Sequence, residues 1–277
     1  MTERVRPKRI IDAHLHFWPS EEYFTQIAKE AGHQNNWEHL SREYARLGIE
    51  GGVVMGNRSL DPADHQYPEN LFYCIGIDRA YLKDNSIEDA AVQIEENLKC
   101  PKCVGIKLYP GYNPTYVWDE IYEPVYELAE SYQKPVAIHT GETAGPNALL
   151  KYCHPMTLDE AAVRHPKVQF VMCHFGNPWL MDAAAVVDKN PNVALDLSGL
   201  LEGRVDVDQL YRKKKGYLET LRTWLDYMER YEDVMFGTDW PLVNLEEYID
   251  FISRLIPEEE LDKVFFENAN RIYGLGL

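Results

Sequence analysis

Eight short apolar segments with strand character recur along the 277 residues of this chain, and segments with helical periodicity separate them. The strand-like segments cover residues 9–17, 49–55, 71–77, 103–109, 134–140, 168–174, 192–199 and 233–239. Several are too continuously apolar to keep one face in water, which is typical of parallel strands covered by helices. Strands that alternate with helices form βαβ units, and eight such units predict an α/β fold, the (β/α)8 or TIM barrel.

The helical segments support this fold. They cover residues 87–99, 117–132, 157–165, 178–190, 210–231, 244–255 and 258–273. Asn85 and Ser86 precede the first of these, and Asn244 precedes another, as helix-capping residues do. The alternative, an open doubly wound sheet, normally has a glycine-rich phosphate turn after its first strand, where this chain reads HFWPSEE. We find no repeat or linker, and we therefore expect one domain over residues 1–277.

Composition excludes several functions. The net charge is −17, and the largest basic cluster is the short run Arg212–Lys215, so we expect no nucleic-acid partner. No stretch of about 18 apolar residues is present, so we expect no membrane span. The start MTERVRPKRI lacks the apolar core of a secretory signal, and the five cysteines show no framework spacing. Cys100 and Cys103 run directly into a strand and are interpreted as free thiols. These features favour a cytoplasmic location.

The stretch IIDAHLHFWP, which begins at residue 10, carries two histidines inside an otherwise apolar strand. Strict alternation along a strand places Asp12, His14 and His16 on one face. A single histidine in such a strand is more often a hydrogen-bonded core residue. Two on one face each need a polar partner, and one metal ion would serve both. We interpret Asp12, one step deeper, as a buried structural carboxylate and not as a ligand.

Polar side chains also stand late in other strands. Lys107 ends the fourth strand, His139 the fifth, His174 the sixth and Asp239 the eighth. In a barrel of parallel strands these ends meet at one mouth, where catalytic residues lie. Four histidines and an aspartate at that mouth predict a divalent metal site. Nitrogen and oxygen ligands suit Zn²⁺ first, then Mn²⁺ or Fe²⁺. Cys173, next to His174, is expected to point the opposite way, so no cysteine ligand is predicted.

The loops after the strands are expected to recognise substrate. Arg58 follows the second strand and is placed to meet a carboxylate through two hydrogen bonds. Tyr112 follows the fourth strand, and Trp240 follows Asp239. Together with Lys107 they are our candidate substrate-binding residues, although ordinary loop packing is the alternative for each. The expected partner is a small-molecule carboxylic acid.

Six stretches together resemble the amidohydrolase superfamily, in particular its amidohydrolase 2 branch. They are IIDAHLHFWP, VGIKLYPGYNP, PVAIHTGET, VQFVMCHFG, MFGTDWP and ENANRIYGL, and they span nearly the whole chain in the order of the family. That branch includes aminocarboxymuconate-semialdehyde decarboxylase, related aromatic-acid decarboxylases and some lactone hydrolases. The resemblance also allows for a homodimer.

The resemblance implies a role for each matched residue. His14, His16, His139 and Asp239 match metal ligands; Asp239 also shuttles a proton, and His174 contacts the reactive water or the substrate. The stretch around Lys107 resembles that of the carboxylated, metal-bridging lysine of dihydroorotases. If Lys107 is carboxylated, the site is binuclear, and His139 and His174 hold the second metal. The branch is mostly mononuclear, so we expect one metal, with Lys107 binding a substrate anion or pairing with a carboxylate.

Two enzyme functions and one non-enzymatic function agree with this pattern. The first is a metal-dependent hydrolase that attacks a lactone, amide or ester of a small carboxylic acid with a metal-activated water. The alternative is a metal-dependent nonoxidative decarboxylase of an unsaturated or aromatic acid. The third, a barrel whose metal is structural or absent, lacks the cysteine-rich ligand pattern of closed zinc sites. The sequence favours the hydrolase.

Overall fold

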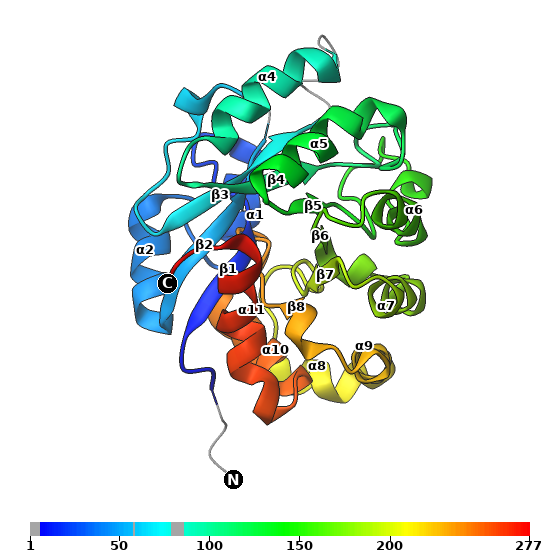
Figure 1. Cartoon of the computed structure of the whole chain (residues 1–277). Coiled ribbons are helices and arrows are strands. Elements are labelled where there is room, and N and C mark those ends of the chain that lie inside the picture. Colours follow the sequence, from blue (N-terminus) through cyan, green and yellow to red (C-terminus); the bar gives the residue numbers. More distant parts are fainter. Residues whose placement is uncertain (1–5, 58, 79–85) are drawn as a thin grey trace.

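The structure, a computed structural model, describes residues 6–57, 59–78 and 86–277 (Figure 1). Eight parallel strands pair in the order β1 to β8, so each strand lies beside its neighbour in sequence. Their bounds are β1 Ile10–Leu15, β2 Ile49–Met55, β3 Leu71–Ile77, β4 Cys103–Leu108, β5 Val136–Ile138, β6 Phe170–Met172, β7 Val193–Asp196 and β8 Val234–Met235. The prediction of a TIM barrel is confirmed, and all eight strands lie within the segments expected from the sequence.

The barrel closes between its first and last strands without a regular ladder. The backbone N–H of Asp239 donates to the carbonyl of His14 at 2.7 Å, and that of His16 donates to the carbonyl of Trp240 at 2.7 Å. These bonds extend the contact between the first and last strands beyond the end of β8, which is only two residues long. They also hold the HxH segment of β1 against the Asp239 turn, so closure of the barrel and assembly of the site depend on the same contacts.

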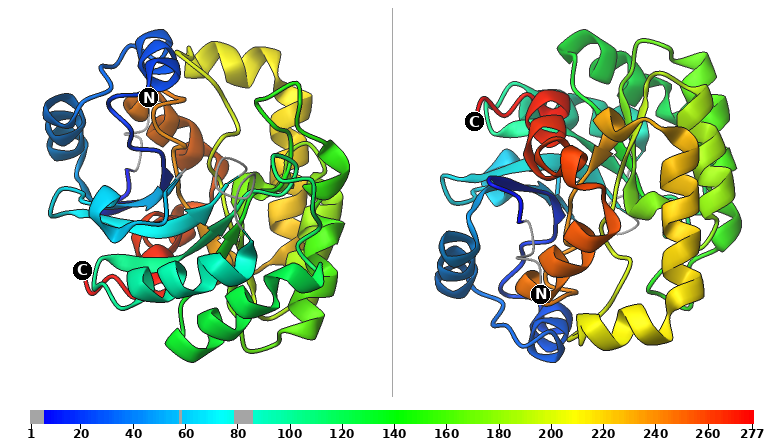
Figure 2. Two further views of the ribbon diagram at one scale, coloured as in Figure 1. Left: turned by 90° about the horizontal axis from the view of Figure 1, so that it is seen from above. Right: turned by 90° about the horizontal axis from the view of Figure 1, so that it is seen from below.

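Helices surround the strands in both views of Figure 2. Their bounds are α1 Glu22–Glu30, α2 Trp37–Leu47, α4 Ile87–Leu98, α5 Glu123–Tyr132, α6 Met156–Arg164, α7 Leu180–Lys189, α8 Val207–Lys213, α9 Lys215–Met228, α10 Leu245–Leu255 and α11 Asn268–Tyr273. Helices α1 and α2 lie in a region where no helix is predicted from the sequence. The single helix predicted over 210–231 is wrong, because Lys214 leaves helical geometry and divides the segment into α8 and α9. Both helices contact α10, and α9 also packs against α7. None of the helices in these ranges is long and apolar enough to cross a bilayer.

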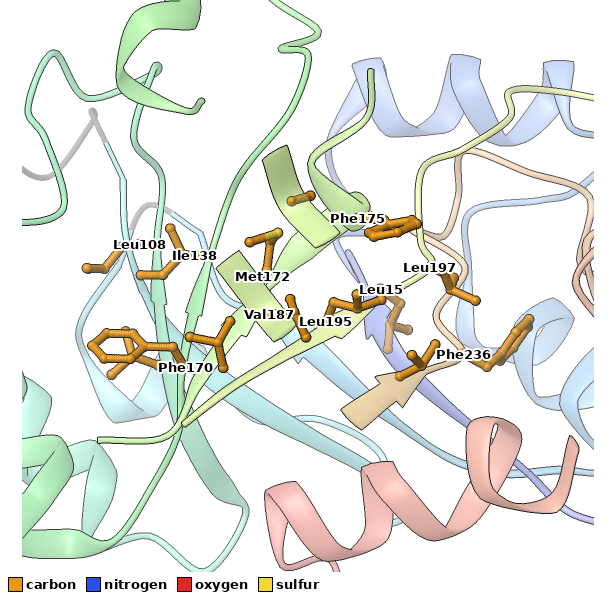
Figure 3. Close-up of a cluster of buried hydrophobic side chains, with 14 of the residues drawn as sticks. Leu15, Leu108, Ile138, Phe170, Met172, Phe175, Val187, Leu195, Leu197 and Phe236 are labelled. Atoms are coloured by element: carbon orange, nitrogen blue, oxygen red, sulfur yellow. The ribbon is translucent and has the colours of Figure 1, made fainter. Parts of the chain in front are cut away.

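The core has two layers. Large side chains on the outer face of the sheet, such as Phe170 and Leu195, pack against side chains of the surrounding helices. One of these is Val187 of α7 (Figure 3). Smaller side chains fill the barrel itself and pack against residues of the C-terminal helix. This inner cluster includes Ile11, Ala13, Ala137, Val171, Ala194, Ala269 and Tyr273. Burial of both faces explains why the strands read as continuous apolar runs.

A β-bulge in β1 changes which residues face the barrel. Asp12 is in register with Gly52 and Leu15 with Val54, so three steps along β1 match two along β2. The extra residue shifts the alternation. Asp12 therefore faces outward and accepts a hydrogen bond from the Tyr44 hydroxyl of α2 at 2.9 Å, whereas His14 and His16 face the mouth. The prediction that Asp12 lies on the same face as His14 and His16 is wrong, because strict alternation does not hold across a bulge.

Candidate metal centre

Three predicted ligands meet above the barrel. Nε2 of His14 lies 3.5 Å from Oδ1 of Asp239, and Nε2 of His16 lies 3.4 Å from the same oxygen. The ligand atoms of the three residues all lie within 4.8 Å of one another. Two come from the end of β1 and one from the turn after β8, where Asp239 has a left-handed backbone with φ of 57°. Two imidazole nitrogens and a carboxylate oxygen around one point form a typical divalent-metal ligand set.

Buried lone pairs without a partner show that a cation fits here. Among the described residues, Nε2 of His14, Nε2 of His139 and Oδ1 of Asp239 are buried and have no hydrogen-bond partner. Leaving such atoms desolvated and unpaired costs about 1–3 kcal/mol each. A metal ion beside His16 would accept electron pairs from Nε2 of His14 and Oδ1 of Asp239, so the residues present fit a divalent cation.

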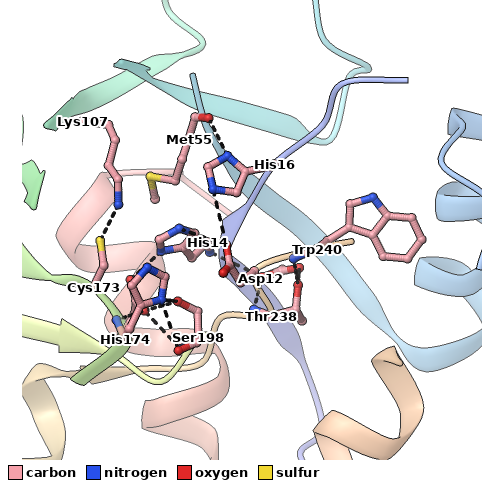
Figure 4. A network of polar contacts seen from close by, with 12 residues as sticks. Asp12, His14, His16, Met55, Lys107, Cys173, His174, Ser198, Thr238 and Trp240 are labelled. Atoms are coloured by element: carbon pink, nitrogen blue, oxygen red, sulfur yellow. Dashed lines mark hydrogen bonds and ion pairs between the residues drawn. The ribbon is translucent and has the colours of Figure 1, made fainter. Parts of the chain in front are cut away.

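Nδ1 of His14 and Nδ1 of His16 each lie within hydrogen-bond distance of an acceptor oxygen. Nδ1 of His14 lies 2.9 Å from Oδ2 of Asp196, at the end of β7, and Nδ1 of His16 lies 2.9 Å from Oδ1 of Asn57 and 3.2 Å from the Met55 carbonyl (Figure 4 shows part of this network). A carboxylate or carbonyl oxygen accepts only, so each Nδ1 carries the hydrogen. Both Nε2 atoms are then free to bind a cation, as metal-ligating histidines require.

The protonation states agree with this arrangement. Burial lowers the pKa of His16 to about 4 and that of His139 well below its ordinary value, so both are neutral near pH 7. Burial would also lower the pKa of His14, but the adjacent Asp196 carboxylate outweighs it and raises the pKa to about 10. A cation at Nε2 would replace that proton. Burial raises the pKa of Asp239, yet the surrounding histidines bring it below its ordinary value and keep the carboxylate charged.

His174 and His139 complete the ring of imidazoles. The His174 ring lies 4.8 Å from that of His14 and 5.0 Å from that of His139. His174 also forms a second group of potential ligands with His14 and Asp196, whereas His139 belongs to neither group of three. All the predicted histidines thus gather at one mouth, and His174 lies next to both His14 and His139.

Lys107 lies beneath these histidines and is completely buried. Its ammonium contacts Sγ of Cys173 at 2.8 Å. The expectation that Cys173 points away from the site is wrong. Cys173 continues the inward direction of Val171, and both belong to the inner cluster. His174 and Phe175 have left-handed backbone angles, φ of 62° and 47°, so the chain turns sharply after Cys173 and the His174 ring also reaches the mouth, beside His14.

The predicted substrate-binding residues differ in their placement. Arg58 lies outside the described residues. The Tyr112 ring lies 5.1 Å from that of His139, and its hydroxyl accepts a hydrogen bond from the Ala144 N–H at 2.9 Å, so Tyr112 lines the site. Trp240 is completely buried, points away from the histidines in Figure 4, and packs 4.8 Å from the His33 ring. This placement favours a packing role for Trp240 over the predicted substrate contact.

Sequence reasoning missed three residues of the site. Asp196 and Ser198 follow one another closely in the stretch VALDLSG at the end of β7, and Asn57 follows β2. The sequence does contain a signal for Asp196. It is a polar side chain late in an apolar strand, as the other predicted site residues are. Asn57 carried no such signal, since its role depends on the position of His16.

The fold and the site together define a metal-dependent enzyme built on a TIM barrel. The chain belongs to the amidohydrolase-2 family: the family model described as Amidohydrolase matches residues 77–275. The resemblance seen in the sequence is therefore confirmed. A search of curated proteins finds no match.

Solved structures share the whole fold at low sequence identity. An uncharacterised TIM-barrel protein from Bordetella bronchiseptica is 22% identical, with 96% of this chain and 99% of that chain covered and a TM-score of 0.73. A dihydroxybenzoic acid decarboxylase from a Polaromonas species, with bound manganese and the inhibitor 2-nitroresorcinol, is 15% identical, with 99% and 98% covered and a TM-score of 0.68. A 5-carboxyvanillate decarboxylase from Sphingomonas paucimobilis is 15% identical, with 96% and 99% covered and a TM-score of 0.64. At these identities the likeness shows the fold alone.

Proposed function

We propose that this protein is a metal-dependent nonoxidative decarboxylase of a small aromatic carboxylic acid. The observation that carries the proposal is the group of buried, unpartnered lone pairs on His14, His139 and Asp239 at the barrel mouth. The named activities of the Polaromonas and Sphingomonas proteins support decarboxylation over the hydrolysis that the sequence favoured. The same residues would serve either reaction, so the two are separated by experiment below.

His14 and His16 would hold the cation through Nε2 and Asp239 through Oδ1, with Nε2 of His139 as a further donor. This nitrogen and oxygen set suits Zn²⁺ or Mn²⁺, and manganese is the metal in the Polaromonas structure. When bound, a divalent cation supplies a Lewis acid that binds substrate oxygens and stabilises negative charge. We expect one metal ion, because the two groups of three potential ligands share His14, and His139 belongs to neither.

Decarboxylation breaks the bond between the ring carbon and the carboxylate. The electron pair stays on the ring carbon, carbon dioxide leaves, and one proton is delivered to that carbon. Asp239 and His174 are our candidates for handling this proton, because their side chains lie close together: a Cβ on Gly199 would lie 2.7 Å from Nδ1 of His174 and 3.3 Å from Oδ2 of Asp239. Protonation of His174 would favour the ionised form of Asp239, so a proton gained by one affects the other.

The charge of Lys107 suits an acidic substrate. Its buried ammonium lies below the mouth and contributes to the lowered pKa values of His16, His139 and His174. The same positive potential would attract a carboxylate into a protein whose overall charge is −17. Lys107 therefore supports binding of an anion even though its own contact in the structure is Cys173.

The test compares the two bond types on one preparation. Protein loaded with Mn²⁺ or Zn²⁺ is incubated with dihydroxybenzoates and 5-carboxyvanillate, and in parallel with aryl esters and lactones, while carbon dioxide and newly formed acid are measured. We expect metal-dependent carbon dioxide release from at least one aromatic acid. Formation of free acid from an ester or lactone, with no carbon dioxide from any aromatic acid, would overturn the proposal in favour of hydrolysis.

A further inference from the structure

A hydrogen-bonded chain connects the end of β7 to His174. Ser198 Oγ donates to Oδ1 of Asp196 and lies 2.8 Å from Nδ1 of His174. The same Oδ1 accepts the backbone N–H of His174 at 3.0 Å and that of Ser198 at 3.1 Å. Figure 4 shows Ser198 directly beside the His174 ring. Asp196 and Ser198 are both completely buried, so protein groups, and not bulk water, decide where the hydrogens lie.

The number of hydrogens available determines the tautomer of His174. Both oxygens of Asp196 face donors: Oδ1 accepts two backbone N–H groups, and Oδ2 lies 2.9 Å from Nδ1 of His14, so the carboxylate only accepts. The single hydroxyl hydrogen of Ser198 is therefore used on Asp196. Ser198 Oγ can then only accept from the imidazole, so Nδ1 of His174 must carry a hydrogen.

The backbone carbonyl of Ser198 also favours a hydrogen on Nδ1 of His174. The carbonyl oxygen of Ser198 lies 3.3 Å from Nδ1 of His174, and a carbonyl oxygen also accepts only. In the opposite tautomer, the bare lone pair of Nδ1 would face two oxygens with no hydrogen between them. Among the described residues, Nε2 of His174 has no hydrogen-bond partner that would favour a hydrogen on that side.

We infer that Ser198 is a positioning residue that holds neutral His174 in the Nδ1–H form, so that Nε2 is the nitrogen that takes up and releases the proton that His174 moves. Asp196 thereby orients two imidazoles with one carboxylate, His14 through Oδ2 and His174 through Ser198 and Oδ1. The kinetic part of this inference rests on the proposed function, but the tautomer itself does not.

The direct test is nitrogen NMR of the zinc-loaded protein labelled with ¹⁵N-histidine. Long-range proton–nitrogen spectra distinguish protonated from bare ring nitrogens, and the signals missing from His174→Gln identify His174. We expect a protonated Nδ1 and a bare Nε2. A protonated Nε2 with a bare Nδ1 would overturn the inference, whether or not any decarboxylation is found.

The positioning role is tested by kinetics with the substrate found above. Ser198→Ala should lower kcat about 10- to 100-fold, the size of effect expected when a reacting group is misplaced, with KM within about twofold and metal content unchanged. Ser198→Thr, which keeps the hydroxyl, should restore most of the turnover. Tyr73→Phe is the control, because it removes a buried hydroxyl bonded to Asn97 and away from the mouth. Wild-type kcat in Ser198→Ala would overturn the positioning role.

Discussion

Oδ2 of Asp196 lies 2.9 Å from Nδ1 of His14, and neither side chain is exposed to solvent. The carboxylate fixes the plane of the imidazole and the nitrogen that carries its hydrogen, so Nε2 is presented toward Asp239. Asp196, which is not among the residues predicted from the sequence, thus orients His14, which is.

Asp196→Asn should weaken metal binding about 10- to 100-fold, as expected when a partner behind a histidine ligand is lost. Asparagine keeps the size of the side chain but removes the charge that favours a hydrogen on Nδ1 of His14. Competition with a chelator measures the affinity. Asp159→Asn, which removes a carboxylate paired with Lys189 outside the site, is the control. Equal affinities in the two variants would refute the role of Asp196.

His14→Ala and His16→Ala should each abolish activity and reduce bound metal while the fold persists. The physical reason is that these side chains lie at the mouth, whereas the barrel layers beneath supply most of the stability. Metal analysis measures the bound metal, and circular dichroism shows whether the fold persists. His65→Ala removes a similarly buried imidazole beside Tyr73 and should keep its metal. Wild-type metal content in both mouth variants would show that the ligand assignment is wrong.

Asp239→Asn should reduce turnover far more than substrate binding. Asparagine retains an oxygen that can face the metal but cannot accept and release a proton near neutral pH. Transfer of a proton by a positioned group typically contributes about 10²–10⁴-fold to the rate. Turnover and metal content are measured on the same sample, because lost metal would add to the effect. A metal-replete variant with turnover within a few-fold of wild type would rule out the proton-transfer role.

Lys107→Ala distinguishes one metal from two. With one metal, the variant keeps about one ion per chain, and the damage appears as weaker binding of an anionic substrate. Lys107→Met keeps most of the buried volume beside Cys173, so it separates loss of charge from loss of packing. With a carboxylated lysine bridging two ions, most metal would be lost, and acetate or propionate would restore part of it. That result would place His139 and His174 on a second ion.

Gly199→Ala should damage the site beyond the ordinary penalty for left-handed backbone. Gly199 has φ of 64°, and its new Cβ would lie 2.7 Å from Nδ1 of His174, which is closer than real contacts allow. Gly48→Ala is a matched control, because Gly48 has φ of 74° with no atom within 4 Å of a new Cβ. Both variants should lose about 1–2 kcal/mol in free energy of unfolding. Only Gly199→Ala should also lose turnover, and equal turnover in the two would count against close packing at His174.

The sequence determined the barrel and most of the polar residues at its mouth. Strand and helix periodicities are local properties, so they remain visible in a single chain. The order of eight strands then follows from parallel βαβ connections, which place consecutive strands side by side. His14, His16, His139, His174 and Asp239 could be selected because each stands late in its strand, and the structure gathers them at one end.

Only the tertiary structure decided which way several side chains point. The bulge in β1 brings His14 to the mouth while Asp12 faces outward, and the left-handed residues His174 and Phe175 turn the chain so that the His174 ring lies beside His14, both against strict alternation. Asp196 and Ser198 became part of the site only when β7 was placed beside β6 and close to His14. The physical reason is that a bulge, a positive φ and a hydrogen bond between distant strands depend on contacts far apart in sequence, which local periodicity does not record.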